Sequence, residues 1–157
     1  MSDKQQFTIV LFQPQIPQNA GNIVRTCKVT GAKLVLVKPL GFSTSSAALK
    51  RAGLDYWDGV HVEIIDDLPL WLSNSTSPFY FLSSHAKTLY TEIKYDPNSI
   101  FIFGSETSGL PAFFHEKWKD FFVTLPMTKN SRCLNLSNTV SIVLYEAWRQ
   151  NDFWGHL

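Results

Sequence analysis

Residues 100–111, IFIFGSETSGLP, join two opposite kinds of sequence without a linker. The first four are all apolar, as in a strand that is buried on both faces of a parallel sheet. The next residues are glycines, hydroxyls and one carboxylate, none of which a globular core needs. Polar loops that directly follow strands are where open α/β sheets hold their ligands. The stretch therefore predicts an α/β fold with a ligand site at the end of this strand.

The rest of the chain repeats the pattern of short apolar runs separated by helical segments. Further strands are predicted over residues 7–12, 33–37, 60–65, 78–83 and 121–125. Helices are predicted over residues 19–30, 44–51, 67–72, 111–117 and 136–148, the first capped by Asn19 and ended by Gly31. This alternation predicts a mostly parallel sheet with helices on both faces, as in a small flavodoxin-like or Rossmann-like domain.

Size and composition are typical of one compact domain. The chain has 157 residues, of which 45% are hydrophobic, so we expect a single domain over residues 1–157 with residues 1–6 flexible. No signal peptide is visible and no apolar run approaches the ~20 residues of a membrane span. The two cysteines and four histidines have no metal-ligand spacing. We therefore expect a cytoplasmic protein with neither a membrane partner nor a metal.

The formal net charge of +1 argues against binding of nucleic acid by bulk charge. Local patches matter more than the total, and two of them are visible. One is Lys50 with Arg51, and the other is Lys129 with Arg132. Either patch is compatible with an ordinary solvated surface or with contacts to phosphate groups.

A second polar segment, residues 127–140 (MTKNSRCLNLSNTV), precedes the last predicted helix. Arg132, Asn135, Ser137 and Asn138 crowd the entry to this helix, and helix capping explains only one or two of them. Cys133 has no neighbouring base that would make it a nucleophile, so we expect it to pack against a ligand. Tyr145 lies two turns beyond Asn138, where it either faces the same site or is a half-buried core residue.

A third segment surrounds the start of the first helix. Asn19, Gly21 and Asn22 lie where free N–H groups and the helix dipole favour an anion, and Arg25 lies one turn further on. An ordinary capped helix with an exposed arginine explains the same residues. Glu106 likewise is either a site residue or the surface carboxylate of a tight turn.

Together these segments resemble the SPOUT superfamily of RNA methyltransferases. Within it they are similar to the tRNA 2'-O-methyltransferases of the TrmL (YibK) type, which act on the wobble nucleotide. The matching stretches are residues 19–25 (NAGNIVR), 51–56 (RAGLDY), 103–111 (FGSETSGLP), 131–138 (SRCLNLSN) and 145–150 (YEAWRQ). The resemblance implies an α/β-knot fold with a deep C-terminal trefoil knot. It also implies a homodimer whose active sites are completed across the subunit interface.

The resemblance further implies an activity and a cofactor. The reaction would be S-adenosylmethionine-dependent 2'-O-methylation of the ribose at position 34, a cytidine or modified uridine, in tRNA, with leucine tRNAs as the expected substrates. S-adenosylhomocysteine would be the product, and no metal would be needed. The cofactor would contact Leu82, Ser83, Gly104, Glu106, Leu125, Met127, Cys133 and Leu134. The family more often has serine at the position of Cys133.

Residues for catalysis and for tRNA binding follow from the same resemblance. Arg25, Arg132 and Tyr145 are the expected catalytic residues. The expected substrate-binding residues are Asn19, Asn22, Arg25, Lys50, Arg51, Arg132, Ser137 and Asn138. Since a guanidinium stays protonated, we expect Arg25 to bind the phosphate beside the target ribose and to polarise the hydroxyl rather than to act as a base.

Two alternatives stay open at this point. One is a SPOUT enzyme that methylates another ribose in tRNA or rRNA, and the other is a non-catalytic nucleotide-binding α/β module. Dimerisation has one support in the residues themselves, the apolar Trp148, Phe153 and Trp154 near the C-terminus. Ordinary core packing explains these three residues equally well.

Overall fold

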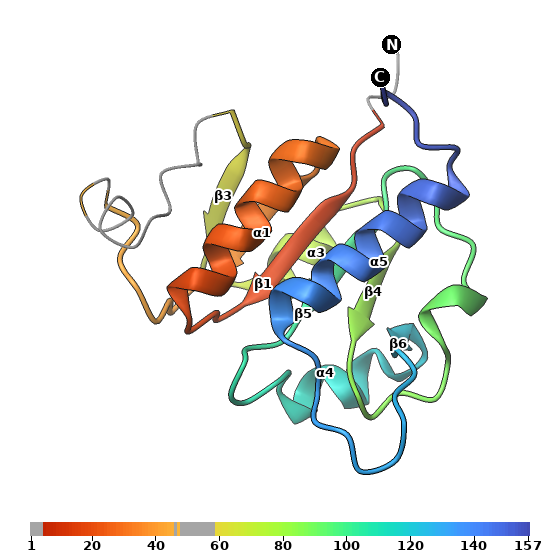
Figure 1. Cartoon of the computed structure of the whole chain (residues 1–157). Helices are drawn as coiled ribbons and strands as arrows, with labels where there is room; N and C mark the ends of the chain where they lie inside the picture. Colours follow the sequence, from red (N-terminus) through yellow and green to blue (C-terminus); the bar gives the residue numbers. More distant parts are fainter. Residues whose placement is uncertain (1–4, 46, 48–58) are drawn as a thin grey trace.

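A six-stranded parallel sheet forms the centre of the molecule, in the order β3-β2-β1-β5-β4-β6 (Figure 1). The computed structural model describes residues 5–45, 47 and 59–157. The strands are β1 (Thr8–Phe12), β2 (Lys33–Val37), β3 (Val62–Ile65), β4 (Phe79–Leu82), β5 (Ile100–Phe103) and β6 (Phe122–Val123). Because β1 pairs with both β2 and β5, it is central, as expected of a run whose three middle residues are fully buried.

Helices cover both faces of the sheet. They are α1 (Pro17–Thr30), α3 (Leu68–Ser73), α4 (Ala112–Lys117) and α5 (Leu136–Gln150), with short 3-10 turns η1 (Tyr90–Glu92) and η2 (Lys119–Phe121). Helices α1 and α5 lie side by side and pack on Ile9, Leu11 and their neighbours (Figure 1). Helices α3 and α4 cover Val10 and Val35 on the opposite face. The predicted mostly parallel α/β fold is therefore confirmed.

Most predicted elements match the structure within one or two residues at each end, and the last strand differs most in length. Strand β6 has two residues instead of five, because η2 occupies Phe121 and Thr124 forms only an isolated bridge with Leu89. The helix predicted over residues 44–51 falls mainly outside the residues that the structure describes. The shorter β6 does not change the strand order of the sheet.

The start of α1 differs from the prediction that Asn19 caps it. The helix begins at Pro17, a residue suited to the first turn because it has no N–H to satisfy. Ile16 occupies the capping position and offers no side-chain hydrogen bond. Asn19 is thus inside the helix, and the free N–H groups at its start need an acceptor from elsewhere in the chain.

The chain that leaves β6 runs beside the loop that follows β4. Thr124 N donates to Thr88 O at 2.9 Å, and Tyr90 N donates to Thr124 O at 2.8 Å. From there the chain passes through residues 126–135 and continues as α5 on the face of the sheet that α1 also covers (Figure 1). The trefoil knot itself stays a prediction.

The aromatic residues at the C-terminus are divided between the core and the surface. The Trp154 ring packs on the Phe7 ring with centroids 4.8 Å apart, and Trp148 Nε1 donates to Trp154 O at 3.0 Å. Phe153 keeps 37% of its surface exposed. Core packing therefore explains the two tryptophans. They give no direct support for a dimer.

Candidate functional site

A cavity of about 580 Å³ opens at the carboxyl ends of β4, β5 and β6. Parallel strands end at the same edge, so the loops that follow them meet there. Its walls come from three segments far apart in the sequence, namely residues 82–85, 103–110 and 124–139, together with the start of α1. The volume lies within the range of about 300–1,000 Å³ that is typical of small-molecule sites.

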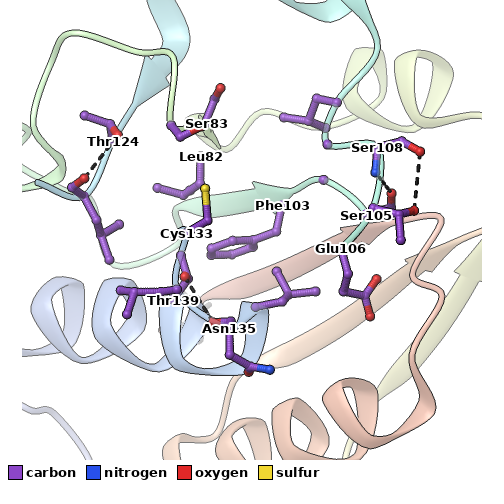
Figure 2. A pocket seen from close by; sticks show the side chains of 18 of the residues that line it. Leu82, Ser83, Phe103, Ser105, Glu106, Ser108, Thr124, Cys133, Asn135 and Thr139 are labelled. Carbon is purple, nitrogen blue, oxygen red and sulfur yellow. Dashed lines mark hydrogen bonds between the residues drawn. The ribbon is translucent and has the colours of Figure 1, made fainter. Parts of the chain in front are cut away.

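Apolar side chains form much of the wall of the cavity. Leu82 and Phe103 are buried at the ends of β4 and β5, and Leu125 lies beyond β6. In Figure 2 the thiol of Cys133 lies beside Leu82 and Phe103. At the mouth, Leu134 keeps 45% of its surface exposed, which a ligand with an apolar face would cover.

The loop after β5 is folded back tightly on itself. Ser105 N donates to Gly109 O at 3.3 Å and Gly109 N donates to Ser105 O at 3.0 Å. A Cβ atom on Gly104 would lie 2.4 Å from the carbonyl carbon of Gly109, so only glycine fits. The loop therefore presents backbone amides and carbonyls to the cavity, beside apolar walls.

Glu106 supplies the acceptor that the start of α1 lacks. Its Oε1 accepts from Gln15 N at 2.9 Å, and its Oε2 accepts from Ile16 N at 2.9 Å and from Asn19 Nδ2 at 3.1 Å. Partial burial acts to raise the pKa of Glu106, but these hydrogen bonds outweigh it and hold the pKa below its ordinary value. The carboxylate is thus ionised at neutral pH and is committed to the helix start.

The network continues from Asn19 to the last helix. Asn135 Nδ2 donates to Asn19 Oδ1 at 2.9 Å, and Asn135 Oδ1 accepts from Ser137 N at 2.9 Å as the cap of α5. Asn19 is only 5% exposed, so the pairing of its amide is needed for stability. One polar chain therefore connects the loop after β5 to the starts of α1 and α5.

All eight residues predicted to bind the cofactor line this cavity: Leu82, Ser83, Gly104, Glu106, Leu125, Met127, Cys133 and Leu134. Of the predicted substrate-binding residues, Asn19 alone reaches it among those that the structure describes. Its amide is engaged in hydrogen bonds within the chain, as is the buried side chain of Ser137. The geometry therefore indicates that the side chains of Asn19 and Ser137 position the loops and do not contact a nucleotide directly.

The predicted catalytic residues lie outside the cavity within one chain. Arg25 and Asn22 are exposed on α1, and Tyr145 is 41% exposed on α5. The two helices are joined there by a 3.3 Å hydrogen bond between the hydroxyls of Thr26 and Ser141. Within one chain these exposed polar residues therefore lie on the α1–α5 surface, outside the cavity.

The two basic patches of the sequence have different outcomes. Arg132 and Lys129 are exposed in the segment between β6 and α5, next to the cavity residue Cys133. Lys50 and Arg51 fall outside the described residues.

Several cavity residues were not predicted from the sequence. His85 and His115 line the wall, although the spacing of the histidines indicated no site. Thr107, Ser108 and Thr139 also line it. His85 follows β4 by only three residues, so its place after a strand was a usable signal, whereas the position of His115 depends on how α4 docks.

Comparison with known proteins agrees with this architecture. The profile of the SpoU rRNA methylase family matches residues 6–145. A tRNA (cytidine(34)-2'-O)-methyltransferase of Methylovorus glucosotrophus is 43% identical over 151 residues, which cover 95% of this chain and 98% of that protein. A structure solved to study the 2-OH methylation of C/U34 on tRNA superposes with a TM-score of 0.84 at 37% identity, covering 95% of this chain and 98% of that one.

A more distant structure shares the fold. The SpoU methyltransferase AviRb from Streptomyces viridochromogenes, in complex with the cofactor AdoMet, superposes with a TM-score of 0.77 at 20% identity. It covers 95% of this chain and 62% of that one.

Fold and cavity together are those of a SPOUT-type methyltransferase. The chain belongs to the SpoU rRNA methylase family, and the expected resemblance is confirmed. Among the described residues no helix is both long and apolar enough to cross a membrane. Within the same part of the chain no three His, Cys, Asp or Glu side chains are grouped to hold a metal ion.

Proposed function

We propose that this chain transfers a methyl group from S-adenosylmethionine to the ribose 2'-oxygen of the nucleotide at position 34 of tRNA. The observation that carries the proposal is the cavity at the ends of β4, β5 and β6, in a chain that is 43% identical to a relative named for this activity. Position 34 comes from that name, and cytidine or modified uridine in leucine tRNAs is the finer expectation. The enzyme would act in the cytoplasm as a homodimer.

The cavity suits S-adenosylmethionine in both size and chemistry. Leu82, Leu125 and Leu134 provide apolar surfaces for the faces of an adenine ring, and the backbone of the loop after β5 provides hydrogen-bonding groups for its edge and for a ribose. The close approach of Gly104 to Gly109 keeps this loop free of side chains that would occupy the space. Bound there, S-adenosylmethionine supplies an electrophilic methyl group.

The residues of the chain would contribute mainly alignment and charge. Holding two reacting groups in line can lower the barrier by several kcal/mol, up to about 7–11 in ideal cases. The Glu106–Asn19–Asn135 chain would fix the loop that holds the donor relative to the starts of α1 and α5. Arg25 would bind the phosphate beside the target ribose and polarise its 2'-hydroxyl, with Arg132 and Tyr145 orienting the nucleotide.

Because Arg25 and Tyr145 lie on the α1–α5 surface, the proposed homodimer has a specific task. Both residues are exposed there and neither lines the cavity of its own chain. A second copy packed on this surface would bring the arginine of one subunit to the cavity of the other. This arrangement supports a shared active site, in which neither chain is complete by itself.

Incubation of the purified protein with labelled S-adenosylmethionine and bulk tRNA tests the proposal. We expect label in tRNA, and digestion to nucleosides followed by position mapping should find it on the 2'-oxygen of nucleotide 34. The matched control is Arg25→Ala, which should bind S-adenosylhomocysteine with near-normal affinity and transfer no methyl group. Label in another ribose of tRNA or rRNA would reassign the substrate, and binding without any transfer would favour a non-catalytic module.

A further inference from the structure

A second hollow, of about 480 Å³, lies beside the candidate cofactor cavity. It is bounded by the loop after β4 on one side and by α4, η2 and β6 on the other. His85 and His115 line both spaces, so these two side chains form a common wall. The hollow, which we call the lysine groove, also includes Lys87, Thr88, Lys119 and Asp120.

The walls of the lysine groove are held in place by the backbone. Ser83 N donates to Val123 O at 3.0 Å, and Thr88 O accepts from Thr124 N at 2.9 Å. The loop is thus anchored at both ends. On the other wall, the His115 ring stacks on the Phe122 ring with centroids 4.3 Å apart. A ligand would find the groove formed in advance, which reduces the entropy lost on binding.

The charges of the groove favour an anion. Lys87 and Lys119 are both exposed, and Asp120 is the acidic residue among the lining side chains. In the described part of the chain, the recorded ion pairs use Lys33, Lys38 and Arg149, so the two groove lysines are in none of them. Since the whole chain carries a net charge of only +1, an attraction for a polyanion must come from local groups such as these.

We propose that the lysine groove binds a phosphate group of the RNA strand whose ribose is methylated. The inference rests on the proposed function, because an RNA whose ribose enters the cavity must continue past its mouth on both sides. The groove shares a wall with the cavity, so a nucleotide flanking the target is the segment that reaches it. Lys87 and Lys119 bind the phosphate as two point charges, and they contribute affinity without reading sequence.

The dependence of tRNA binding on salt tests this role. We compare the wild type with Lys87→Ala/Lys119→Ala and with Lys94→Ala, which removes an exposed lysine that is not part of the groove. The double variant should bind tRNA several-fold more weakly, with a log–log salt slope shallower by about 0.7, the value for one phosphate contact of a single strand. Lys94→Ala should leave the slope unchanged, and Lys87→Arg/Lys119→Arg should restore it.

Calorimetry with S-adenosylhomocysteine and with adenosine monophosphate tests whether the lysine groove binds a small ligand instead of RNA. Unchanged affinity for both ligands in the double variant, together with the shallower tRNA slope, supports the proposal. A loss of affinity for either small ligand with an unchanged tRNA slope would overturn it, as would an unchanged slope alone. A wild type that binds no tRNA would contradict the proposed function itself, which a methyl-transfer assay reports separately.

Discussion

The carboxylate of Glu106 and the side-chain amide of Asn19 are joined by a 3.1 Å hydrogen bond across 87 residues of sequence. Asn19 in turn accepts from Asn135 at the start of α5, so one buried amide connects two helices to the loop after β5. The same carboxylate receives the N–H groups at the start of α1. Although Glu106 lines the candidate cofactor cavity, it therefore acts first as a distant cap for a helix.

Replacement of Glu106 by glutamine should destabilise the fold in spite of the similar shape. A glutamine offers one oxygen acceptor, so its NH₂ group would face a backbone N–H of residue 15 or 16 that now donates to the carboxylate. An unsatisfied donor of this kind costs about 1–3 kcal/mol. Urea unfolding should show this loss for Glu106→Gln and almost none for Glu116→Gln, a charge removed from the exposed side of α4. Equal stability of the two variants would contradict the capping role.

The strands of this fold could be predicted from the sequence, whereas the cap of α1 could not. The apolar runs that became β2 and β5 were predicted with their observed ends, because burial on both faces leaves a continuous hydrophobic signature. Asn19 was predicted as a cap because local sequence suggests local partners. The actual acceptor lies 90 residues away from Ile16 in sequence, and no periodicity encodes such a contact.

The candidate site, too, could be predicted from the sequence only in part. Residues at the end of a strand or directly after it, such as Leu82 and Gly104, line one cavity, since parallel strands bring their carboxyl ends together. Their contact with a cofactor stays a prediction. His115 was missed because it lies on α4, a short helix whose docking depends on Phe114, Phe122 and other packing of the second core. The placement of Arg25 outside the cavity depends on which face of α1 it occupies, and in the proposed homodimer a second chain would bring it to a site.

Stability should fall in acid partly because of Glu106. Its pKa in the folded protein is below the ordinary value of 4.5, so the unfolded chain takes up this proton at a higher pH than the folded chain does. The stabilisation is therefore complete above about pH 4.5 and is lost as the pH falls through the lower pKa of the folded state. Glu63 and Glu146 also have lowered pKa values, through hydrogen bonds chiefly from Lys33 and Arg149, and act in the same direction.

Unfolding free energies measured by urea at neutral pH and at several values below pH 4.5 check this prediction. The decrease should be smaller in Glu106→Gln than in the wild type, because the variant cannot lose that proton-linked contribution. Glu116→Gln should follow the wild-type curve. Parallel curves for Glu106→Gln and the wild type would show that this carboxylate is not protonated differently in the two states.

The two cysteines should differ sharply in reactivity. Cys133 is exposed at the cavity, whereas Cys27 is 1% exposed and burial raises its pKa to about 12. The thiolate is the reactive form, so a thiol reagent should modify Cys133 in the folded protein and reach Cys27 only after unfolding. S-adenosylhomocysteine should slow the modification, since its proposed site includes Cys133. As a control, Cys133→Ser should show no thiol modification in the folded protein. An unchanged modification rate of the wild type with saturating S-adenosylhomocysteine would place the ligand elsewhere.

Mixed dimers should show whether two chains share one active site. Arg25→Ala should lack the proposed phosphate contact, and Gly104→Ala should lack a usable cofactor cavity, so each variant alone should be inactive. If the arginine of one chain serves the cavity of the other, a mixed dimer has one intact site of its two. Random mixing makes half of the dimers mixed, so activity should return to about a quarter of the wild-type value. No recovery after verified subunit exchange would show that each chain uses its own arginine.

The tight turn after β5 should make Gly104 the least replaceable residue of the cavity. An added Cβ would meet the Gly109 carbonyl carbon at 2.4 Å and Leu110 N at 2.7 Å, and backbone atoms cannot move aside as a flexible side chain can. Gly104→Ala should therefore open the turn and weaken binding of S-adenosylhomocysteine at least about tenfold, which is ~1.4 kcal/mol. Gly109→Asn is the matched control, because nothing lies within 4 Å of its Cβ position and asparagine tolerates the φ of +64° there. Calorimetry should find near-normal affinity in Gly109→Asn, and the same result in Gly104→Ala would mean that the ligand does not depend on this turn.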